Sequence, residues 1–141
     1  MQTITPYLLY EDVEAALEFL SRAFGFEEVL RYTGSAGYIS HAEMRHGDGT
    51  IMLGDPGHDY RNPRRLGEAT VQVYVDVDDV DALYERATAA GAEVIDEPSD
   101  QEYGDRRFGA RDPEGHSWWF AQRVREIAPE QWGAQPAHSG R

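Results

Sequence analysis

The stretch "VDDVDALYERATAAGAEVID" (residues 77–96) decides the fold, because the chain contains the same pattern once before. The earlier copy is "YEDVEAALEFLSRAFGFEEVL" (residues 10–30). Each copy has an aspartate suited to cap a helix, Asp12 or Asp79, followed by apolar residues at helical spacing. Each predicted helix then ends at a glycine, which can adopt the left-handed conformation found after helix C-termini.

The two copies belong to a longer repeat, and its register can be tested outside the helices. The two capping aspartates are 67 residues apart. At the same offset "IML" (residues 51–53) aligns with "WWF" (residues 118–120), the last strand-like run of each half. Small insertions interrupt only the middle of the repeat. We therefore interpret the chain as a duplication in which each half forms one strand, one helix and three further strands.

The predicted fold class is α+β, with tandem βαβββ modules at residues 3–54 and 70–122. In the first module we expect strands at 3–10, 26–33, 37–46 and 49–54, and a helix at 12–24. In the second we expect strands at 70–77, 92–96, 105–111 and 117–122, and a helix at 79–90. The modules form one domain (1–126), joined by a Pro- and Gly-containing linker (55–69). A short helical turn and a tail follow (127–141).

The composition excludes several classes of protein. The formal net charge of −13 argues against nucleic acid, because phosphate binding needs a basic surface. There is no cysteine, which removes disulfides, thiolate nucleophiles and cysteine-ligated zinc. There is no lysine either, so Schiff-base chemistry is excluded. Neither a signal peptide nor a membrane-spanning run is present, so we expect a cytoplasmic protein that does not interact with membranes.

Four segments carry a resemblance to a known family. They are "ITPYLLYEDVEAALEFLSRAFG", "HAEMRHGDGTIMLGD", "VDDVDALYERATAAGAEV" and "DQEYGDRRFGARDPEGHSWWFA". Together they resemble the vicinal oxygen chelate superfamily of glyoxalase I, bleomycin resistance proteins and extradiol dioxygenases, and within it the PhnB-like branch. The resemblance implies two side-by-side modules whose sheets curl into a cup with helices outside. It also implies a homodimer and a small-molecule ligand in the concave cavity.

The same resemblance predicts where a metal would bind. Metal-dependent members place one ligand in the first strand and a glutamate in the last strand of each module. Here those positions hold Thr5, Met52, Gln72 and Trp119, of which only Gln72 could coordinate a metal, and weakly. We therefore expect no metal and no cofactor. A displaced site involving His41 and Glu43, which share one face of a strand, stays open beside the simpler reading of a polar pair lining the cavity.

The segment "DQEYGDRRFGARDPEGHSWWFA" (residues 100–121) combines a turn, a core strand and polar candidates. "DPEG" is typical of a type I turn, after which His116 is expected to bond backbone. Trp118 and Phe120 should face the helix-covered core, which places Trp119 on the opposite face as an aromatic wall. Arg106 could bind a ligand carboxylate or carbonyl, or form an ion pair with Asp105.

The predicted ligand-binding set is mostly apolar and aromatic, with a few polar groups for orientation. It consists of Tyr7, Leu9, His41, Glu43, Met52, Gln72, Tyr74, Tyr103, Arg106 and Trp119. The alternative for most of these residues is a collapsed second core that fills the cup.

We predict a metal-independent protein that holds an aromatic or cationic metabolite or drug, as in bleomycin-type antibiotic resistance. The alternative is a lyase, isomerase or dioxygenase of the same superfamily, with a displaced metal site or with His41, Glu43 and Arg106 as acid–base residues. A third possibility is an interaction role in which the cup is vestigial.

Overall fold

The computed structural model describes residues 2–35 and 37–137 of the 141-residue chain, so residues 138–141 of the predicted tail lie outside the described part. The first module contains β1 (Tyr7–Leu9), α1 (Val13–Phe24), β2 (Glu27–Tyr32), β3 (His41–His46) and β4 (Gly49–Gly54). A short helix, α2 (Pro63–Leu66), lies in the linker. The second module contains β5 (Gln72–Asp76), α3 (Val80–Ala89), β6 (Glu93–Asp100), β7 (Asp105–Arg111) and β8 (Ser117–Arg123). A 3-10 turn, η1 (Pro129–Trp132), follows.

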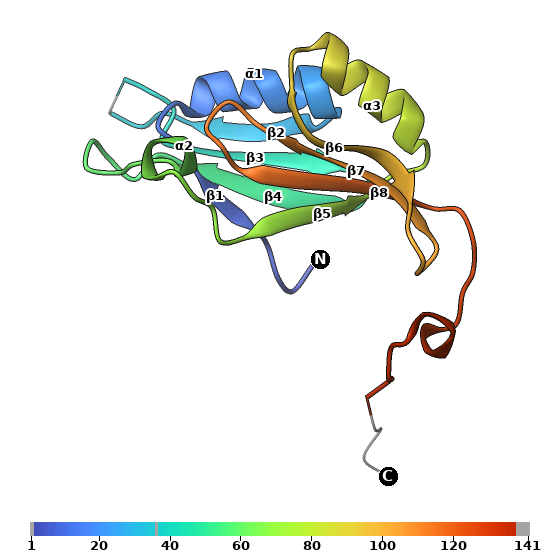
Figure 1. The fold of residues 1–141 in the computed structure, drawn as a ribbon. Coiled ribbons are helices and arrows are strands. Elements are labelled where there is room, and N and C mark those ends of the chain that lie inside the picture. Colours follow the sequence, from blue (N-terminus) through green and yellow to red (C-terminus); the bar gives the residue numbers. More distant parts are fainter. Residues whose placement is uncertain (1, 36, 138–141) are drawn as a thin grey trace.

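The strands form two four-stranded mixed sheets with the same topology (Figure 1). The first sheet has the order β1-β4-β3-β2 and the second has the order β5-β8-β7-β6. In each sheet the first pair is parallel and the other two pairs are antiparallel. The predicted α+β class and the tandem βαβββ modules are confirmed.

The backbone pairing confirms the register of the repeat. Tyr7 lies opposite Met52 in the first sheet, and Tyr74 lies opposite Trp119 in the second, so both partners shift together by the repeat offset. One strand deviates from this offset. His41 pairs with Gly54, and Arg107 pairs with Ala121, which is the repeat counterpart of Gly54. Arg107 is therefore the structural counterpart of His41, although it lies one position closer to it than the repeat offset.

Element boundaries differ from the prediction where prolines and caps act. The first strand is much shorter than residues 3–10, and it begins directly after Pro6, which has no N–H to donate. The strand predicted at 92–96 continues to Asp100. The helix α2 was not predicted, although its signals are in the sequence. The side chain of Asn62 caps it by accepting from the backbone N–H of Arg65 at 2.9 Å, and a proline occupies its first turn.

The two long helices begin and end as their sequences indicate. Asp12 accepts a hydrogen bond from the N–H of Ala15 at 3.0 Å, and Asp79 accepts one from Ala82 at 3.1 Å. Gly25 ends α1 with a φ of 79°, a left-handed conformation that glycine adopts without strain. The apolar side of each helix packs onto a sheet.

One hydrophobic core joins the two modules. It contains the apolar side of α1, the start of α3 and the inner faces of both sheets, including the predicted residues Val13, Leu17, Leu20, Ile51, Leu53, Val80, Trp118 and Phe120, with Leu83 packed against them. Phe24 of α1 links the modules directly, because its ring centroid lies 5.7 Å from that of Trp118 and 4.7 Å from that of Phe120. Trp118 and Phe120 are completely buried, as predicted.

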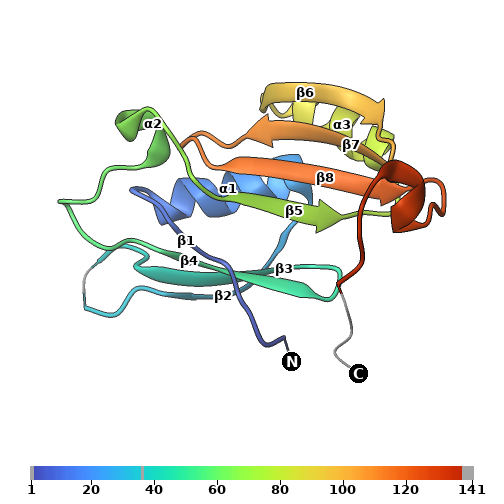
Figure 2. The same cartoon turned by 60° about the horizontal axis from the view of Figure 1, so that its bottom comes forward.

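The two sheets form a V, with the two long helices on its inside. The edge strands β1 and β5 lie on the two sides of its vertex, and β2 and β6 lie at its two ends (Figures 1 and 2). The two sheets are not hydrogen-bonded to each other within the described residues. Because α1 and α3 fill the inside of the V, the uncovered faces of both sheets lie on its outside and point away from each other.

The turn "DPEG" docks the second module onto the first. Asp112 is 1% exposed and accepts hydrogen bonds from the hydroxyl of Tyr10 at 2.6 Å and from Nε1 of Trp118 at 3.1 Å. Glu114 accepts from the backbone N–H groups that precede α1, at 2.7 and 2.9 Å. His116 Nε2 lies 2.8 Å from the carbonyl oxygen of Leu9, so its predicted bond to backbone is confirmed. The hairpin is therefore a clamp between modules.

The described helices include none that is long and apolar enough to cross a membrane.

Candidate ligand-binding site

The predicted site residues are divided between two surfaces. We call the uncovered face of the first sheet the first face; it carries Tyr7, Leu9, Leu30, Tyr32, His41, Glu43 and Met52. We call the uncovered face of the second sheet the second face; it carries Gln72, Tyr74, Asp105, Arg107, Arg111, Trp119 and Arg123. Residues that pair directly across strands share one face of a sheet, which assigns each set to its side.

A chain of three hydrogen-bonded side chains crosses the first face. The hydroxyl of Tyr7 lies 2.8 Å from Nδ1 of His41, and Nε2 of His41 lies 3.2 Å from a carboxylate oxygen of Glu43. Because Glu43 can only accept when ionised, the matching tautomer of His41 donates from Nε2 and accepts a hydrogen bond from the Tyr7 hydroxyl at Nδ1. The arrangement could pass a proton from Tyr7 to His41, and exposed apolar side chains surround it.

Trp119 lies flat on the second face. A Cβ atom added at Gly109, directly opposite in β7, would lie 2.7 Å from Cζ3 of its ring, so only glycine leaves room for the indole there. On the other side of the ring Cζ of Arg107 lies 4.5 Å from the ring centroid, within cation–π distance. Trp119 thus points away from the core, and Arg107 covers it.

Two donors on this face have no acceptor. Nε of Arg107 and Nε1 of Trp119 are buried, and neither has a hydrogen-bond partner within the described residues. Leaving a buried donor without an acceptor costs about 1–3 kcal/mol, and the cation–π contact offsets only part of that cost. Both groups are donors only, so the missing partner is an acceptor.

A second hydrogen-bonded group flanks Trp119. Asp105, which is 6% exposed, accepts from the hydroxyl of Tyr74 at 2.8 Å and from Nε of Arg123 at 2.8 Å. The hydroxyl of Tyr103 lies 3.3 Å from that of Tyr74. Desolvation, followed by the hydrogen bonds to Tyr103 and Asp105, raises the pKa of Tyr74 well above its usual range, so the phenol stays protonated and donates. This group links β5, β7 and β8 at the edge of the second face.

Arg106 does not join the site. Its guanidinium pairs with Asp81 at the start of α3 and with Asp100 in β6, both at 3.1 Å. The ion pair considered between Asp105 and Arg106 is wrong, because adjacent strand residues point to opposite faces and Asp105 pairs with Arg123 instead. Arg106 therefore fastens α3 to the second sheet from the helix side.

The residues at the superfamily's metal positions do not fit a metal. Met52 lies on the first face and Trp119 on the second. Neither side chain offers a nitrogen or oxygen lone pair for coordination. Both ring nitrogens of His41 already have partners, and no group of three His, Asp or Glu side chains suited to a metal exists among the described residues.

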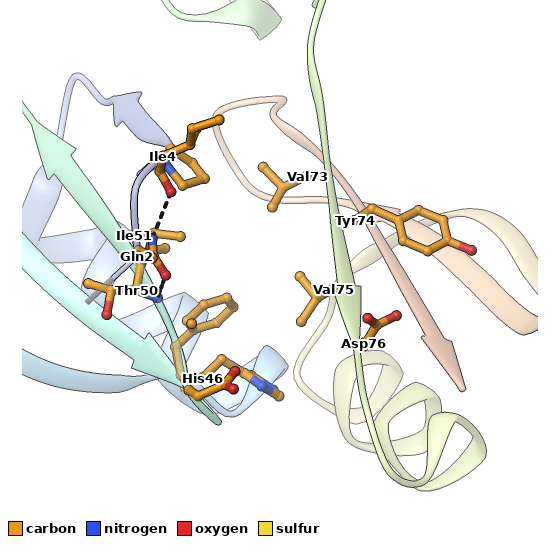
Figure 3. A pocket seen from close by; sticks show the side chains of 13 residues that line it. Gln2, Ile4, His46, Thr50, Ile51, Val73, Tyr74, Val75 and Asp76 are labelled. Atoms are coloured by element: carbon orange, nitrogen blue, oxygen red, sulfur yellow. Dashed lines mark hydrogen bonds between the residues drawn. The ribbon is translucent and has the colours of Figure 1, made fainter. Parts of the chain in front are cut away.

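A small cavity lies at the vertex of the V, between the two sheets (Figure 3). Its volume is about 290 Å³, and it is lined by Ile4, Ile51, Val73 and Val75 with His46 at one end. Figure 3 shows Val73 and Val75 pointing into the cavity, while Tyr74 between them points away to the second face. Burial lowers the pKa of His46, which favours a neutral imidazole beside these apolar groups.

Arg107 is the main site residue that the sequence interpretation missed. The repeat contained the signal, because Arg107 is the counterpart of the candidate His41, but the one-residue change of spacing between β3 and β7 obscured it. Of the predicted set, Tyr7, Leu9, His41, Glu43 and Met52 come together on the first face. Gln72, Tyr74 and Trp119 lie on the second face, and Tyr103 reaches its edge through Tyr74.

Comparisons with known proteins agree with this fold. A family model described as "Glyoxalase/Bleomycin resistance protein/Dioxygenase superfamily" matches residues 3–120. The protein Mb0911c of Mycobacterium bovis is 35% identical over 142 residues, an alignment that covers 97% of this chain and 93% of that protein.

Solved structures show the same arrangement of elements. The crystal structure of TioX from Micromonospora sp. ML1 is 35% identical, with a TM-score of 0.72, and covers 88% of this chain and 100% of that one. A glyoxalase/bleomycin resistance protein/dioxygenase from Nocardioides is similar in fold, with 23% identity, a TM-score of 0.66, and coverage of 99% and 91%. These matches do not single out the PhnB-like branch, which stays a prediction.

Proposed function

Because this chain belongs to the glyoxalase/bleomycin resistance protein/dioxygenase superfamily, we propose that it binds a small aromatic metabolite or drug without a metal. The observation that carries the proposal is Trp119. It occupies a metal-ligand position of the superfamily, lies flat on Gly109 and points away from the core. Aromatic side chains with a few polar groups are the usual lining of small-molecule sites. A cationic ligand, which the sequence left open, is disfavoured by Arg107 on the same face.

Calorimetric titration of chelator-treated protein against a panel of aromatic compounds tests this function. We expect binding that is lost in Trp119→Ala and kept in Trp132→Ala, which removes a tryptophan from the 3-10 turn η1. Ligand binding that depends on added metal, or that is indifferent to Trp119, would contradict the proposal.

We further propose that a second copy of the chain completes the site. If two copies meet at the vertices of their Vs around a two-fold axis, the first face of one copy and the second face of its partner enclose one cavity, and this occurs twice. Two features support this arrangement. Among the described residues the outer edges of β1 and β5 have no strand partner at the vertex, and aromatic side chains on both faces are exposed, with Tyr7 at 51%, Tyr32 at 61% and Tyr74 at 46%.

The hydrogen-bonded chain of Tyr7, His41 and Glu43 favours a second candidate function, an acid–base enzyme of the same superfamily. In such an enzyme Tyr7 would take a proton from a bound substrate as its own proton moves to Nδ1 of His41, and Glu43 would stabilise the imidazolium. A glyoxalase assay with and without added Ni²⁺, Zn²⁺ or Mn²⁺ tests this candidate. Turnover that His41→Gln abolishes would support it, and turnover unaffected by that change would not.

A further inference from the structure

We propose that Arg107 anchors a carboxylate of the aromatic ligand, so that the protein selects aryl carboxylates over neutral and cationic aromatic compounds. This inference rests on the proposed ligand-binding function and specifies its chemistry. It follows from three properties of Arg107: its free charge, its buried N–H group and its position over Trp119.

Arg107 has no salt-bridge partner among the described residues. Its neighbours are all paired: Arg106 with Asp81 and Asp100, Arg111 with Glu93, and Arg123 with Asp105. No carboxylate of the described residues forms a salt bridge with Arg107, although the chain contains 26 acidic residues. Although the second face also carries the carboxylates of Asp76 and Asp96, neither forms a salt bridge with Arg107, so its guanidinium is available to a negative ligand group.

The unpaired donors specify which ligand group fits. Arg107 Nε and Trp119 Nε1 both lack an acceptor within the described residues. A carboxylate has two acceptor oxygens and no donor, and it binds a guanidinium through two parallel hydrogen bonds. An ammonium group would add a third unsatisfied donor and a like charge. A neutral amide would supply one acceptor without the charge.

The position of Arg107 suggests how the aromatic part of the ligand is accommodated. One side of the Trp119 ring rests on Gly109 and the other is covered by the guanidinium. When Arg107 turns to a carboxylate, it frees the outer side of the indole for a ligand ring. Stacking and ion pairing are then coupled, because one side-chain movement provides both contacts.

Calorimetry with three probes of one shape tests the inference: 2-naphthoate, 2-naphthamide and 2-naphthylmethylamine. We expect the wild-type protein to bind naphthoate at least about tenfold more tightly than naphthamide, as one charge-assisted pair predicts. The preference should shrink as salt is added, because the pair is partly exposed. Arg107→Gln should abolish the preference while naphthamide still binds. The matched control Arg125→Gln removes an exposed arginine from the segment after β8 and should keep the preference.

The outcomes separate the inference from the function on which it rests. Equal binding of naphthoate and naphthamide, or tighter binding of the amine, overturns the carboxylate anchor and leaves aromatic binding intact. A preference that survives Arg107→Gln overturns the role of Arg107. Failure of all three probes counts against both proposals. If Arg107→Gln does not fold, the probe ratio and its salt dependence in the wild-type protein still decide the question.

Discussion

Asp112 shows at the scale of one residue how a buried carboxylate can hold two modules together. It accepts from Tyr10 of the first module and from Trp118 of the second, and from the backbone N–H groups of Glu114 and His116 at 3.1 and 3.0 Å. A carboxylate can accept about four hydrogen bonds, so the acceptor capacity of Asp112 is filled. Its burial is tolerated because each lone pair has a donor.

We predict that Asp112→Ala destabilises the protein by about 3–5 kcal/mol, because two buried side-chain donors lose their acceptor at once. Urea unfolding measures the loss. The control Asp59→Ala changes a side chain that is 97% exposed, and its effect should stay within about 0.5 kcal/mol. A loss below about 1 kcal/mol for Asp112→Ala would show that the clamp does not hold the modules.

Tyr10 makes the free energy of unfolding depend on pH in the alkaline range. Burial, followed by the charge of Asp112, raises the pKa of Tyr10 well above its usual value near 10. Above about pH 10 the unfolded chain loses this proton and the folded protein keeps it, so the free energy of unfolding falls as pH rises. Tyr60 acts in the same direction, because desolvation, followed by the charge of Glu114, raises its pKa to about 12.

We predict that Tyr10→Phe makes this fall shallower, by up to about 1.4 kcal/mol per pH unit above pH 10. Urea unfolding between about pH 9 and 11 measures the slope for both proteins. Phe cannot ionise, so the variant loses the alkaline sensitivity of position 10 while it also loses one hydrogen bond at every pH. Equal slopes in the two proteins would contradict a buried, protonated Tyr10.

At the residue scale, the sequence correctly predicted side chains whose direction follows from alternation along a strand. Alternation placed Trp118 and Phe120 in the core and Trp119 opposite, because successive side chains of a strand point to opposite faces. It failed for Asp105, whose partner is Arg123 rather than Arg106. The ion-pair partner of a side chain depends on which strand lies next to its own. Strand pairing is decided by contacts between residues far apart in the sequence, so a local pattern does not reveal the partner.

At the scale of elements, α1 is the helix that both modules share. Its buried side, which includes Leu17 and Leu20, packs into the shared core beside β2 and β3, and its last residue, Phe24, reaches the second sheet. The helix was predictable in type and in length, because a capping aspartate, apolar residues at helical spacing and a terminal glycine agree with one another. The short helix α2 was missed because it buries no residue, which leaves only its cap and its proline as signals.

We predict that Leu17→Ala costs about 2–5 kcal/mol, since Leu17 is 3% exposed and its removal leaves a cavity in the shared core. Thermal or urea unfolding measures the change, and Phe120→Ala should have an effect of similar size. Leu66→Ala in α2 is the matched control, because Leu66 is 52% exposed and should cost well under 1 kcal/mol. Similar losses at Leu17 and Leu66 would mean that α1 does not pack as described.

At the scale of the whole molecule, the first face and the second face point apart, so a single chain offers two open half-sites. The resemblance implied sheets curled around one cup with helices outside. In this chain the helices lie inside the V, and the second copy proposed above would be needed to enclose a ligand between the two faces.

We predict a homodimer that Ile4→Arg dissociates, because Ile4 is 83% exposed and lines the cavity at the vertex where the copies would meet. Sedimentation velocity at micromolar concentration should show a dimer for the wild-type protein and a monomer for the variant. Ligand affinity should fall together with dimerisation. Leu66→Arg introduces the same charge away from the vertex and should leave the dimer intact. A monomeric wild-type protein would contradict the two-copy site.

The sequence by itself determined the eight strands and the two long helices, their order, the repeat register outside the β3–β7 change of spacing, and which side chains of β4 and β8 are buried. These properties follow from periodicity, caps and turns, which act over a few residues, and the duplication doubles each signal. Only the tertiary structure decided how the modules are placed. Phe24 packing on Trp118 and Phe120, and Asp112 joining Tyr10 to Trp118, orient one sheet against the other. Such contacts join residues about a hundred positions apart, and no local pattern encodes them. They direct the two faces outward and leave Arg107 over Trp119, because the direction of a face depends on how whole modules pack.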